Sequence, residues 1–369
     1  MKNPAEAGPE QAVSAKETAE QGLLKAVQPL SAQQLALTEL RRHLTDWMTH
    51  EPGARRGTDA EELHQLRVAV RRIEATLGLF RHQLPAPLVQ ARGAAKGVLR
   101  GLGTARDFDV QLAELRRYCA DLPGEERKAA APLKARLEEG RAQARVRMLA
   151  MLDSEATRHW LETLNLASAD FEAEAAPGAP QAALVMPERV RGRFRKLKKA
   201  VRRLDAKSSM RDHHTVRRRA KQLRYAIECG ATLFGKPAEE MLKALRRLQD
   251  RLGAHQDADM AKNRLAELAA SGAPLPPQTL FLMGRLAEHH LSETQQARKT
   301  LERSWARVGG KRWKALRNRM EELRRGTTLP GATPQPEPAL ALPPQPASTD
   351  AHADAAPAAA PAGLRPLRH

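Results

Sequence analysis

Apolar side chains recur at steps of three and four along most of the chain, which is the spacing of one buried stripe on an α-helix. In the stretch "LHQLRVAVRRIEATLGLF" this stripe consists of Leu63, Leu66, Val70, Ile73, Leu77 and Phe80. The alternating β-branched residues that indicate a strand are almost absent, whereas leucine, alanine, arginine and glutamate are frequent. The pattern predicts an all-α protein whose body is nearly all helix.

The same pattern occurs twice in the chain. A shift of 150 residues, with no gap, brings the following positions together: His64 with His214, Arg67 with Arg217, Arg71 with Lys221, Pro87 with Pro237, Leu102-Gly103 with Leu252-Gly253, Asp107 with Asp257 and Asp109 with Asp259. One offset for such different residue types indicates an internal duplication. We therefore expect two tandem helical bundles that face each other across a pseudo-two-fold axis, with a basic groove between them.

Each half is predicted to contain the same helices in the same order. A first helix is expected at residues 33–48 and 188–204, a histidine-bearing helix at 60–84 and 211–234, a third at 88–102 and 239–252, and further helices at 134–152 and 279–301. Gly103 and Gly253 are predicted to end the third helix in the left-handed conformation that glycine favours. Asp107 and Asp257 are then predicted to cap a fourth helix.

Composition suggests where the halves begin and end. Residues 1–30 lack periodicity, and residues 326–369 are rich in proline and alanine, so both ends are predicted to be disordered. The stretch "EAAPGAPQAALVMP" predicts a linker between the halves. The expected organisation is a first bundle over 31–175, a linker over 176–187 and a second bundle over 188–325.

The chain carries a large positive charge. Of its 369 residues, 62 are lysine or arginine and 43 are aspartate or glutamate, a net charge of +19 that favours a polyanionic partner such as nucleic acid, an anionic membrane or polyphosphate. Only 3% of the residues are aromatic, which disfavours single-stranded nucleic acid, because that ligand is usually held by stacking on aromatic rings. Phosphate binding without base stacking fits better.

The sequence also suggests where the protein works. Cys119 and Cys229 are far apart and form no CxxC pair, so neither a disulfide framework nor a zinc knuckle is indicated. No apolar run is long enough to span a membrane, and no secretory signal precedes residue 31. We expect a cytoplasmic protein that does not contact membranes.

Two ridges of basic residues follow the apolar stripes. The first ridge is His64, Arg67 and Arg71, and the second ridge is His214, Arg217, Lys221 and Arg224. Each ridge lies beside the apolar stripe. A charge that only made the protein soluble would lie on the opposite side of the helix. The alternative is that both ridges are solvated faces, which is what most charge runs are. Their position and their repetition at one offset favour anion binding.

A third basic stripe precedes the second ridge. Between Pro187 and Tyr225 the chain has 16 basic and 3 acidic residues. Within this segment Arg195, Lys198 and Arg202 recur at helical spacing beside an apolar stripe, so we expect a folded helix and not a basic tail. So dense a charge destabilises the fold by self-repulsion unless an anion neutralises it.

Four segments resemble the CHAD domain, a family named for its histidine-bearing α-helical character. They are "LHQLRVAVRRIEATLGLF", "LRGLGTARDFDVQLAEL", "HTVRRRAKQLRYAIECGATLFG" and "LQDRLGAHQDADM", and the likeness covers roughly residues 31 to 325. Each motif alone is weak, whereas the ordered and duplicated set is specific. The resemblance implies two helical bundles around a basic channel that binds inorganic polyphosphate, and an association with polyphosphate granules.

The resemblance also implies which residues line that channel. They are the residues of the first and second ridges, with Arg72 as a neighbour. One departure from the family is Glu74, an acid at the position equivalent to Arg224, where the family usually has a basic residue. Many relatives carry an amino-terminal CYTH domain with an ExExK strand, and residues 1–30 show no such motif. We therefore expect a stand-alone binding module with no cofactor.

Three classes of function are consistent with this sequence. The first is non-catalytic polyphosphate binding, the second is nucleic-acid binding, and the third is a metal-dependent phosphohydrolase. For a metal site the suggestive residues are His213, His214, His255, Asp257, Asp259, His289 and His290. However, no His-Asp dipeptide, nucleophile elbow or glycine-rich phosphate loop occurs. We therefore expect no catalytic residues and no metal ligands.

Overall fold

The computed structural model describes residues 30–169, 179–205, 208–270 and 274–328, without the side chains of 210, 254–262 and 293–302. Every regular element within these ranges is a helix, as the sequence predicts. The first half contains α2 (Ala32–Arg56), α3 (Ala60–Leu79), α4 (Ala86–Ala120), α5 (Gly124–Lys128), α6 (Ala131–Asp153) and α7 (Glu155–Ala169). The second half contains α8 (Ala182–Val201), α9 (Met210–Cys229), α10 (Ala231–Phe234), α11 (Lys236–Ala270), α12 (Pro277–Gly309) and α13 (Lys311–Thr328).

Local sequence signals set several helix ends. The Ser31 side chain accepts a hydrogen bond from the Gln34 backbone N–H at the start of α2, and the Gln34 side chain completes the capping box. The helix α2 ends at Gly57, whose φ of 71° is left-handed and therefore suits glycine. Asp59 caps α3, and Ser209, its equivalent at the 150-residue offset, caps α9.

The predicted duplication is present in the backbone. At the 150-residue offset α3 coincides with α9, and α4 coincides with α11, at both of their ends. At the starts of α2 and α8 the two halves exchange hydrogen bonds, from Ala32 N–H to Pro180 and from Ala182 N–H to Leu30. This bridge joins Ser31 to Gln181, which is its own equivalent at the same offset. A residue pairs with its own equivalent only at a two-fold axis, so the pseudo-dyad passes through this bridge.

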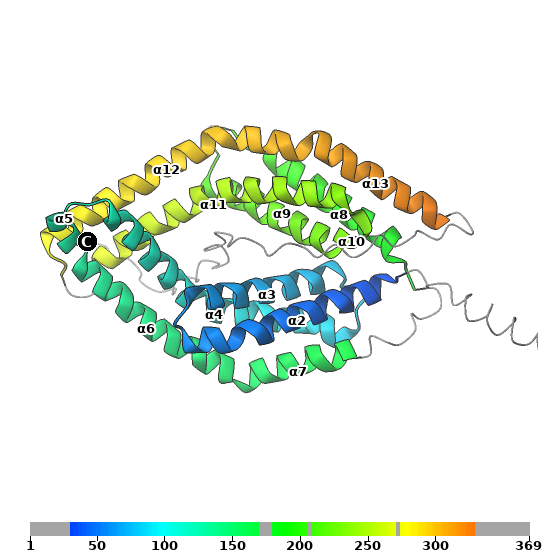
Figure 1. Cartoon of the computed structure of the whole chain (residues 1–369), viewed down its shortest axis with the longest axis horizontal. Helices are drawn as coiled ribbons and strands as arrows, with labels where there is room; N and C mark the ends of the chain where they lie inside the picture. The colour runs from blue at the N-terminus through cyan, green and yellow to red at the C-terminus, as the bar shows by residue number, and fades with distance from the viewer. Residues whose placement is uncertain (1–29, 170–178, 206–207, 271–273, 329–369) are drawn as a thin grey trace, which may run out of the picture.

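Each half packs as its own bundle (Figure 1). In the first half α3 lies between α2 and α4, and α6 and α7 cover α4. In the second half α9 lies between α8 and α11, and α12 and α13 pack over them. The apolar stripes predicted from the sequence are the buried ones: Leu63, Leu66, Val70, Ile73, Leu77 and Phe80 are all within the main core.

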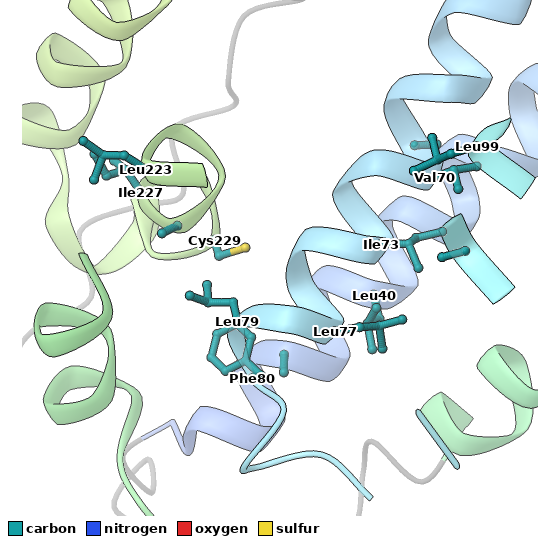
Figure 2. Packing of buried hydrophobic residues seen from close by; sticks show 14 of the residues in the cluster. Leu40, Val70, Ile73, Leu77, Leu79, Phe80, Leu99, Leu223, Ile227 and Cys229 are labelled. Atoms are coloured by element: carbon teal, nitrogen blue, oxygen red, sulfur yellow. The ribbon is translucent and has the colours of Figure 1, made fainter. Parts of the chain in front are cut away.

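The halves contact each other at two separate places (Figure 1). Near the pseudo-dyad, the carboxyl-terminal ends of α3 and α9 meet, with Leu79 and Phe80 beside Cys229 (Figure 2) and Thr76 Oγ1 at 3.6 Å from Cys229 Sγ. At the opposite end, a separate apolar cluster joins α4 and α6 to α12; it includes Leu115 and Leu133 from the first half and Leu286 from the second. The two bundles are therefore held together at both ends.

The predicted break at Gly103 is wrong. The helix α4 runs unbroken for 35 residues through Gly103, and α11 does the same through Gly253, so neither glycine ends a helix. Asp107 and Asp257 consequently lie inside helices and cap nothing. Asp107 instead forms an ion pair with Arg264 of α11 at 2.6 Å. The physical reason for a glycine in the middle of α4 is the close approach of an arginine from α3.

Other boundaries also differ from the sequence prediction. The helix α8 begins at Ala182, inside the predicted linker, because Pro187 is accommodated within the helix. The histidine-bearing helices end at Leu79 and Cys229, several residues before the predicted ends at 84 and 234. The helix α13 extends through Thr328, beyond the predicted start of the tail at 326. The remainder of the predicted disordered ends, and residues 170–178, lie outside the described residues.

Candidate functional site

The first ridge lies on α3 and is buried. His64, Arg67 and Arg71 expose 2%, 6% and 6% of their surface. Their spacing places them on one face of the helix, and Arg67 of this face contacts α4. Basic side chains are almost never buried to this extent in an ordinary solvated face. The hypothesis that the first ridge is only a solubilising surface therefore fails.

Arg67 explains the glycine of α4. Its guanidinium Nη1 donates a hydrogen bond to the backbone carbonyl of Leu99 at 2.9 Å. A Cβ atom at Gly103 would lie 3.1 Å from the same Nη1, closer than nearly all such contacts. Glycine suits this position because the arginine lies directly against the α4 backbone. The sequence signal that marks this contact is the pairing of an arginine and a glycine at one offset in both halves.

The second ridge lies on α9 and is similar, with one difference. Arg217, Lys221 and Arg224 are buried, whereas His214 is half-buried. The neighbouring His213 is the buried histidine of this helix, and it occupies the position equivalent to Leu63 in the first half. Arg224 lies 3.6 Å from Glu228 on the same helix and 5.1 Å from the ring of Tyr225. The second ridge thus has a carboxylate at its end.

Arg71 has the most unusual environment of these side chains. Its Nε and Nη2 atoms are buried, and within the described residues they have no hydrogen-bond partner. A buried charged group without hydrogen bonds costs several kcal/mol, so such groups are normally paired. Donors of this kind are suited to hydrogen bonds with an anion.

Glu74 does not act on the first ridge as an uncompensated charge. Its carboxylate accepts hydrogen bonds from Arg92 of α4, at 2.7 Å from Nη2 and 2.8 Å from Nε. Gly78 makes room for this arginine, because a Cβ atom there would lie 2.9 Å from the guanidinium carbon of Arg92. The acid that departs from the family pattern is therefore neutralised by a basic residue from the neighbouring helix.

Arg72 lies outside the first ridge, in an ion-pair network. It is 3.7 Å from Asp46 of α2 and 4.0 Å from Glu228 of α9. Beside it, the buried His43 is 3.4 Å from Asp46, and burial together with the charge of Arg42 lowers its pKa although the hydrogen bond with Asp46 raises it. The structure therefore places Arg72 among carboxylates that already balance its charge.

The basic stripe of α8 is on the surface. Arg195, Lys198 and Arg202 are exposed, and with Lys199 and Arg203 they surround a shallow hollow of about 420 Å³. The candidate residues thus fall into two groups. One group is the largely buried ridges on α3 and α9, and the other is this exposed stripe on α8. The stripe is the part of the candidate set whose side chains are all exposed.

Sequence reasoning missed two polar residues whose side chains contain buried atoms without hydrogen-bond partners in the described part of the chain. Gln249 of α11 is 3% exposed, and both polar atoms of its side chain lack a hydrogen-bond partner among the described residues. Arg106 of α4 donates to the Ala60 carbonyl at 3.0 Å, while its buried Nε is unsatisfied within the same residues, and burial lowers its pKa. Neither residue belongs to a motif, so no pattern in the sequence marks them.

The remaining candidate chemistries find little support in the described part of the chain. Burial raises the pKa of Cys229 to about 12, so its thiol stays protonated, and burial also raises the pKa of Cys119. Within the described residues, no three histidine, cysteine or acidic side chains gather as metal ligands. The side chains of His255, Asp257 and Asp259 lie outside the described residues. None of the described helices is both long and apolar enough to cross a membrane.

Known proteins resemble this chain in sequence and in fold. Residues 38–266 match the CHAD domain family. The crystal structure of the CHAD domain from the plant Ricinus communis is similar, with a TM-score of 0.64 and 24% identity over 76% of this chain and 93% of that one. PptA from Streptomyces chartreusis is also similar, with a TM-score of 0.58 and 22% identity over 75% of this chain and 99% of that one. No curated protein matches the sequence.

Proposed function

Because this chain belongs to the CHAD domain family, we propose that it binds inorganic polyphosphate through the first and second ridges without cleaving it. The family is associated with polyphosphate binding, and the +19 net charge of this chain suits a long polyanion. No cofactor is needed for this activity. The ligand would supply negative charge beside the buried Nε and Nη2 atoms of Arg71.

The observation that carries this proposal is the environment of Arg71. Its buried Nε and Nη2 atoms lack partners within the described residues. Two phosphate oxygens match the planar fork of a guanidinium, and charge-assisted bonds of this kind contribute about 1.5–3 kcal/mol each. A phosphate chain that reached Arg71 would also lie near His64, which can donate a hydrogen bond or take up a proton beside an anion.

The surface stripe of α8 would act at an earlier step. Arg195, Lys198 and Arg202 are exposed, so they can attract a polyanion from solution before any part of it reaches a buried side chain. Such contacts are screened by salt, whereas contacts to buried cations are screened much less. Neutralising the stripe should therefore slow association more than it weakens the final complex.

The experiment is a titration of the purified chain with long-chain polyphosphate, duplex DNA and RNA at equal phosphate concentration and about 0.15 M salt. We expect the tightest binding to polyphosphate. Tighter binding to either nucleic acid would favour the nucleic-acid alternative. Phosphate release on addition of a divalent metal would instead indicate a phosphohydrolase.

The Arg71→Met variant tests whether polyphosphate binds at the first ridge. Methionine keeps much of the apolar stem but removes a buried charge, so the ligand-free variant should be at least as stable as the wild type. Its affinity for polyphosphate should fall about tenfold or more, because one or two charge-assisted bonds are removed. Unchanged affinity in a normally folded variant would place the polyanion elsewhere.

We also propose that the chain collects on polyphosphate granules in the cytoplasm. The motivation is that recruitment is the simplest role of a chain that binds polyphosphate without cleaving it. A fluorescent fusion of the chain should form foci, and deleting the polyphosphate-synthesising enzyme should disperse them. Foci that persist without polyphosphate, or that follow the nucleoid, would contradict this localisation.

A further inference from the structure

Five arginines from both halves gather where the first ridge reaches the junction between the bundles. We call this set the arginine face: Arg81 after α3, Arg92 on α4, Arg189 and Arg193 on α8, and Arg219 on α9. None of them belongs to either ridge or to the surface stripe of α8. Four of them are half-buried and Arg81 is exposed, so the set is accessible yet partly shielded from water.

Neutral amides hold three of these guanidinium groups in place. The Gln222 side-chain oxygen accepts hydrogen bonds from Arg193 Nη1 at 3.2 Å and from Arg219 Nη1 at 3.0 Å. The Gln83 side-chain oxygen accepts one from Arg189 Nη2 at 3.1 Å, which links the first half to α8. An amide oxygen orients a guanidinium without cancelling its charge, so the positive charges stay close together.

Carboxylates are scarce at this face. Within the described residues, Arg92 alone of the five has a carboxylate partner, which is Glu74. Burial lowers the pKa of Arg193, and four other positive charges lower it further: Arg219, Arg92, Arg189 and Arg81. Burial and the charge of Arg81 likewise lower the pKa of Arg189. The five side chains thus repel one another in the absence of a counter-charge.

The arginine face continues the first ridge. Positions 64, 67, 71, 74 and 78 follow one another along one side of α3. Arg92 contacts the last two of these positions, Glu74 and Gly78. Arg92 in turn interacts electrostatically with Arg193 of α8. A bound chain that follows the first ridge toward the carboxyl end of α3 would therefore arrive at the arginine face.

We propose that the arginine face is a second phosphate-binding site, which holds phosphoryl groups of the same polyphosphate chain beyond the first ridge. Polyphosphate as the ligand rests on the proposed function, whereas the site itself rests on the gathered, amide-oriented guanidinium groups. Pairs of arginines can each present a fork to successive phosphate groups, which releases counterions and makes the affinity depend on salt. The bound chain would then cross from the first half to α8 and α9 of the second.

The test is Arg193→Gln with Arg219→Gln. The matched control is Arg147→Gln with Arg158→Gln, which removes the same charge from exposed positions on α6 and α7. We expect the first pair to weaken polyphosphate binding at least tenfold more than the control. The slope of log affinity against log salt should fall by about 0.7 for each phosphate group that the variant no longer binds. Equal effects of the two pairs would overturn the proposal.

A second variant tests the site even if the double variant fails to fold. Arg81→Gln changes an exposed side chain outside the core, and it should lower the salt slope by about 0.7 while the circular dichroism spectrum stays unchanged. An unchanged slope would count against the site.

A second readout separates this proposal from the proposed function. Pyrophosphate should raise the Tm of the wild type and of Arg71→Met, but not that of the Arg193→Gln, Arg219→Gln variant. If the wild type binds no polyphosphate but pyrophosphate still stabilises it through the arginine face, the proposed function fails and this site stands. If Arg71→Met binds polyphosphate more weakly and the Arg193→Gln, Arg219→Gln variant behaves as the control does, the proposed function stands and the arginine face is not a binding site.

Discussion

The second ridge ends among carboxylates, whereas the first ridge ends among arginines. At the 150-residue offset Glu39 stands where Arg189 does, His43 where Arg193 does, and Glu228 where Gly78 does. The resulting ion-pair face comprises Glu39, Arg42, His43, Asp46, Arg72, Arg224 and Glu228. It has three arginines and three carboxylates, so its formal charge is balanced, while the arginine face has five arginines and one carboxylate.

The difference shows that a duplicated fold can keep its backbone while the charge at equivalent places changes. The formal charges of the ion-pair face are balanced by its own side chains, which join α2, α3 and α9. The arginine face leaves positive charge at the equivalent place. A symmetric fold therefore offers a polyanion two unequal ends, and we expect one end to stabilise the protein and the other to bind the ligand.

The largest expected effect is on stability, from Glu228→Gln. This change removes the carboxylate charge that both Arg224 and Arg72 approach, and Arg224 is buried. Breaking a buried pair leaves an uncompensated charge, so the free energy of unfolding should fall by about 3 kcal/mol in urea titrations. Glu138→Gln, in an exposed pair with Lys134, should cost less than about 0.5 kcal/mol. Similar destabilisation by both changes would mean that the ion-pair face does not stabilise the junction.

The next effect is a pH dependence that the arginine face cannot have. Burial is the largest cause that holds the pKa of His43 below its usual 6.5, so the folded protein keeps it neutral while the unfolded chain takes up a proton. Stability should therefore fall as the pH drops below 6.5, by up to about 1.4 kcal/mol per pH unit.

The measurement is urea unfolding at pH 7.5 and 5.5 in the absence of polyphosphate. His43→Asn keeps a donor toward Asp46 but removes the titrating ring, so its stability should change less between the two pH values. Wild type and variant with the same pH dependence would show that another group is responsible.

A smaller effect should follow from Gly103→Ala, which acts on the first ridge. Alanine favours a helix interior by about 0.5–1 kcal/mol over glycine, but its Cβ would lie 3.1 Å from Arg67 Nη1 and push the guanidinium aside. We expect polyphosphate affinity to fall a few-fold. The control is Gly93→Ala on the same helix, because a Cβ atom at Gly93 would have nothing within 4 Å. This variant should unfold with a higher free energy than the wild type and bind polyphosphate equally well. Strong destabilisation by Gly103→Ala would instead mean that the Arg67 guanidinium cannot move aside for a Cβ atom.

The smallest effect should come from Glu74→Gln. It removes the one carboxylate of the arginine face, so polyphosphate should bind about threefold more tightly, or about 0.6 kcal/mol at moderate salt. The pair with Arg92 is partly exposed, and its removal should cost no more than about 1 kcal/mol of stability. Binding measured by titration at two salt concentrations checks this, and weaker binding would mean that Glu74 chiefly orients Arg92.

The fold and the ridges could be predicted because both are periodic. The apolar stripe around Val70 and Ile73 specifies a helix and its buried side, and one fixed offset specifies the duplication. The position of the first ridge beside that stripe makes it recognisable. The offset selects His214, but the neighbouring His213 is the more deeply buried histidine, because its position is the equivalent of Leu63.

Features that depend on contacts between distant residues could not be predicted. A glycine beside a possible cap favours a helix end by local rules, and only the approach of Arg67 to Leu99 shows why Gly103 is in mid-helix. The arginine face likewise depends on contacts between distant residues. Arg81 and Arg193 are 112 positions apart in the chain and follow no common period.

By itself, then, the sequence determined the all-α class and the duplication, because the first follows from the spacing of apolar residues along a helix and the second from one fixed offset between the halves. It also placed the two ridges beside apolar stripes, whereas their burial is known only from the structure. The tertiary structure decided which charges are neutralised. That depends on which helices the pseudo-two-fold axis brings together, and it places Glu228 against Arg72 on one side and Arg92 near Arg193 on the other. Charge balance is a property of neighbours in space, and a local pattern cannot encode it.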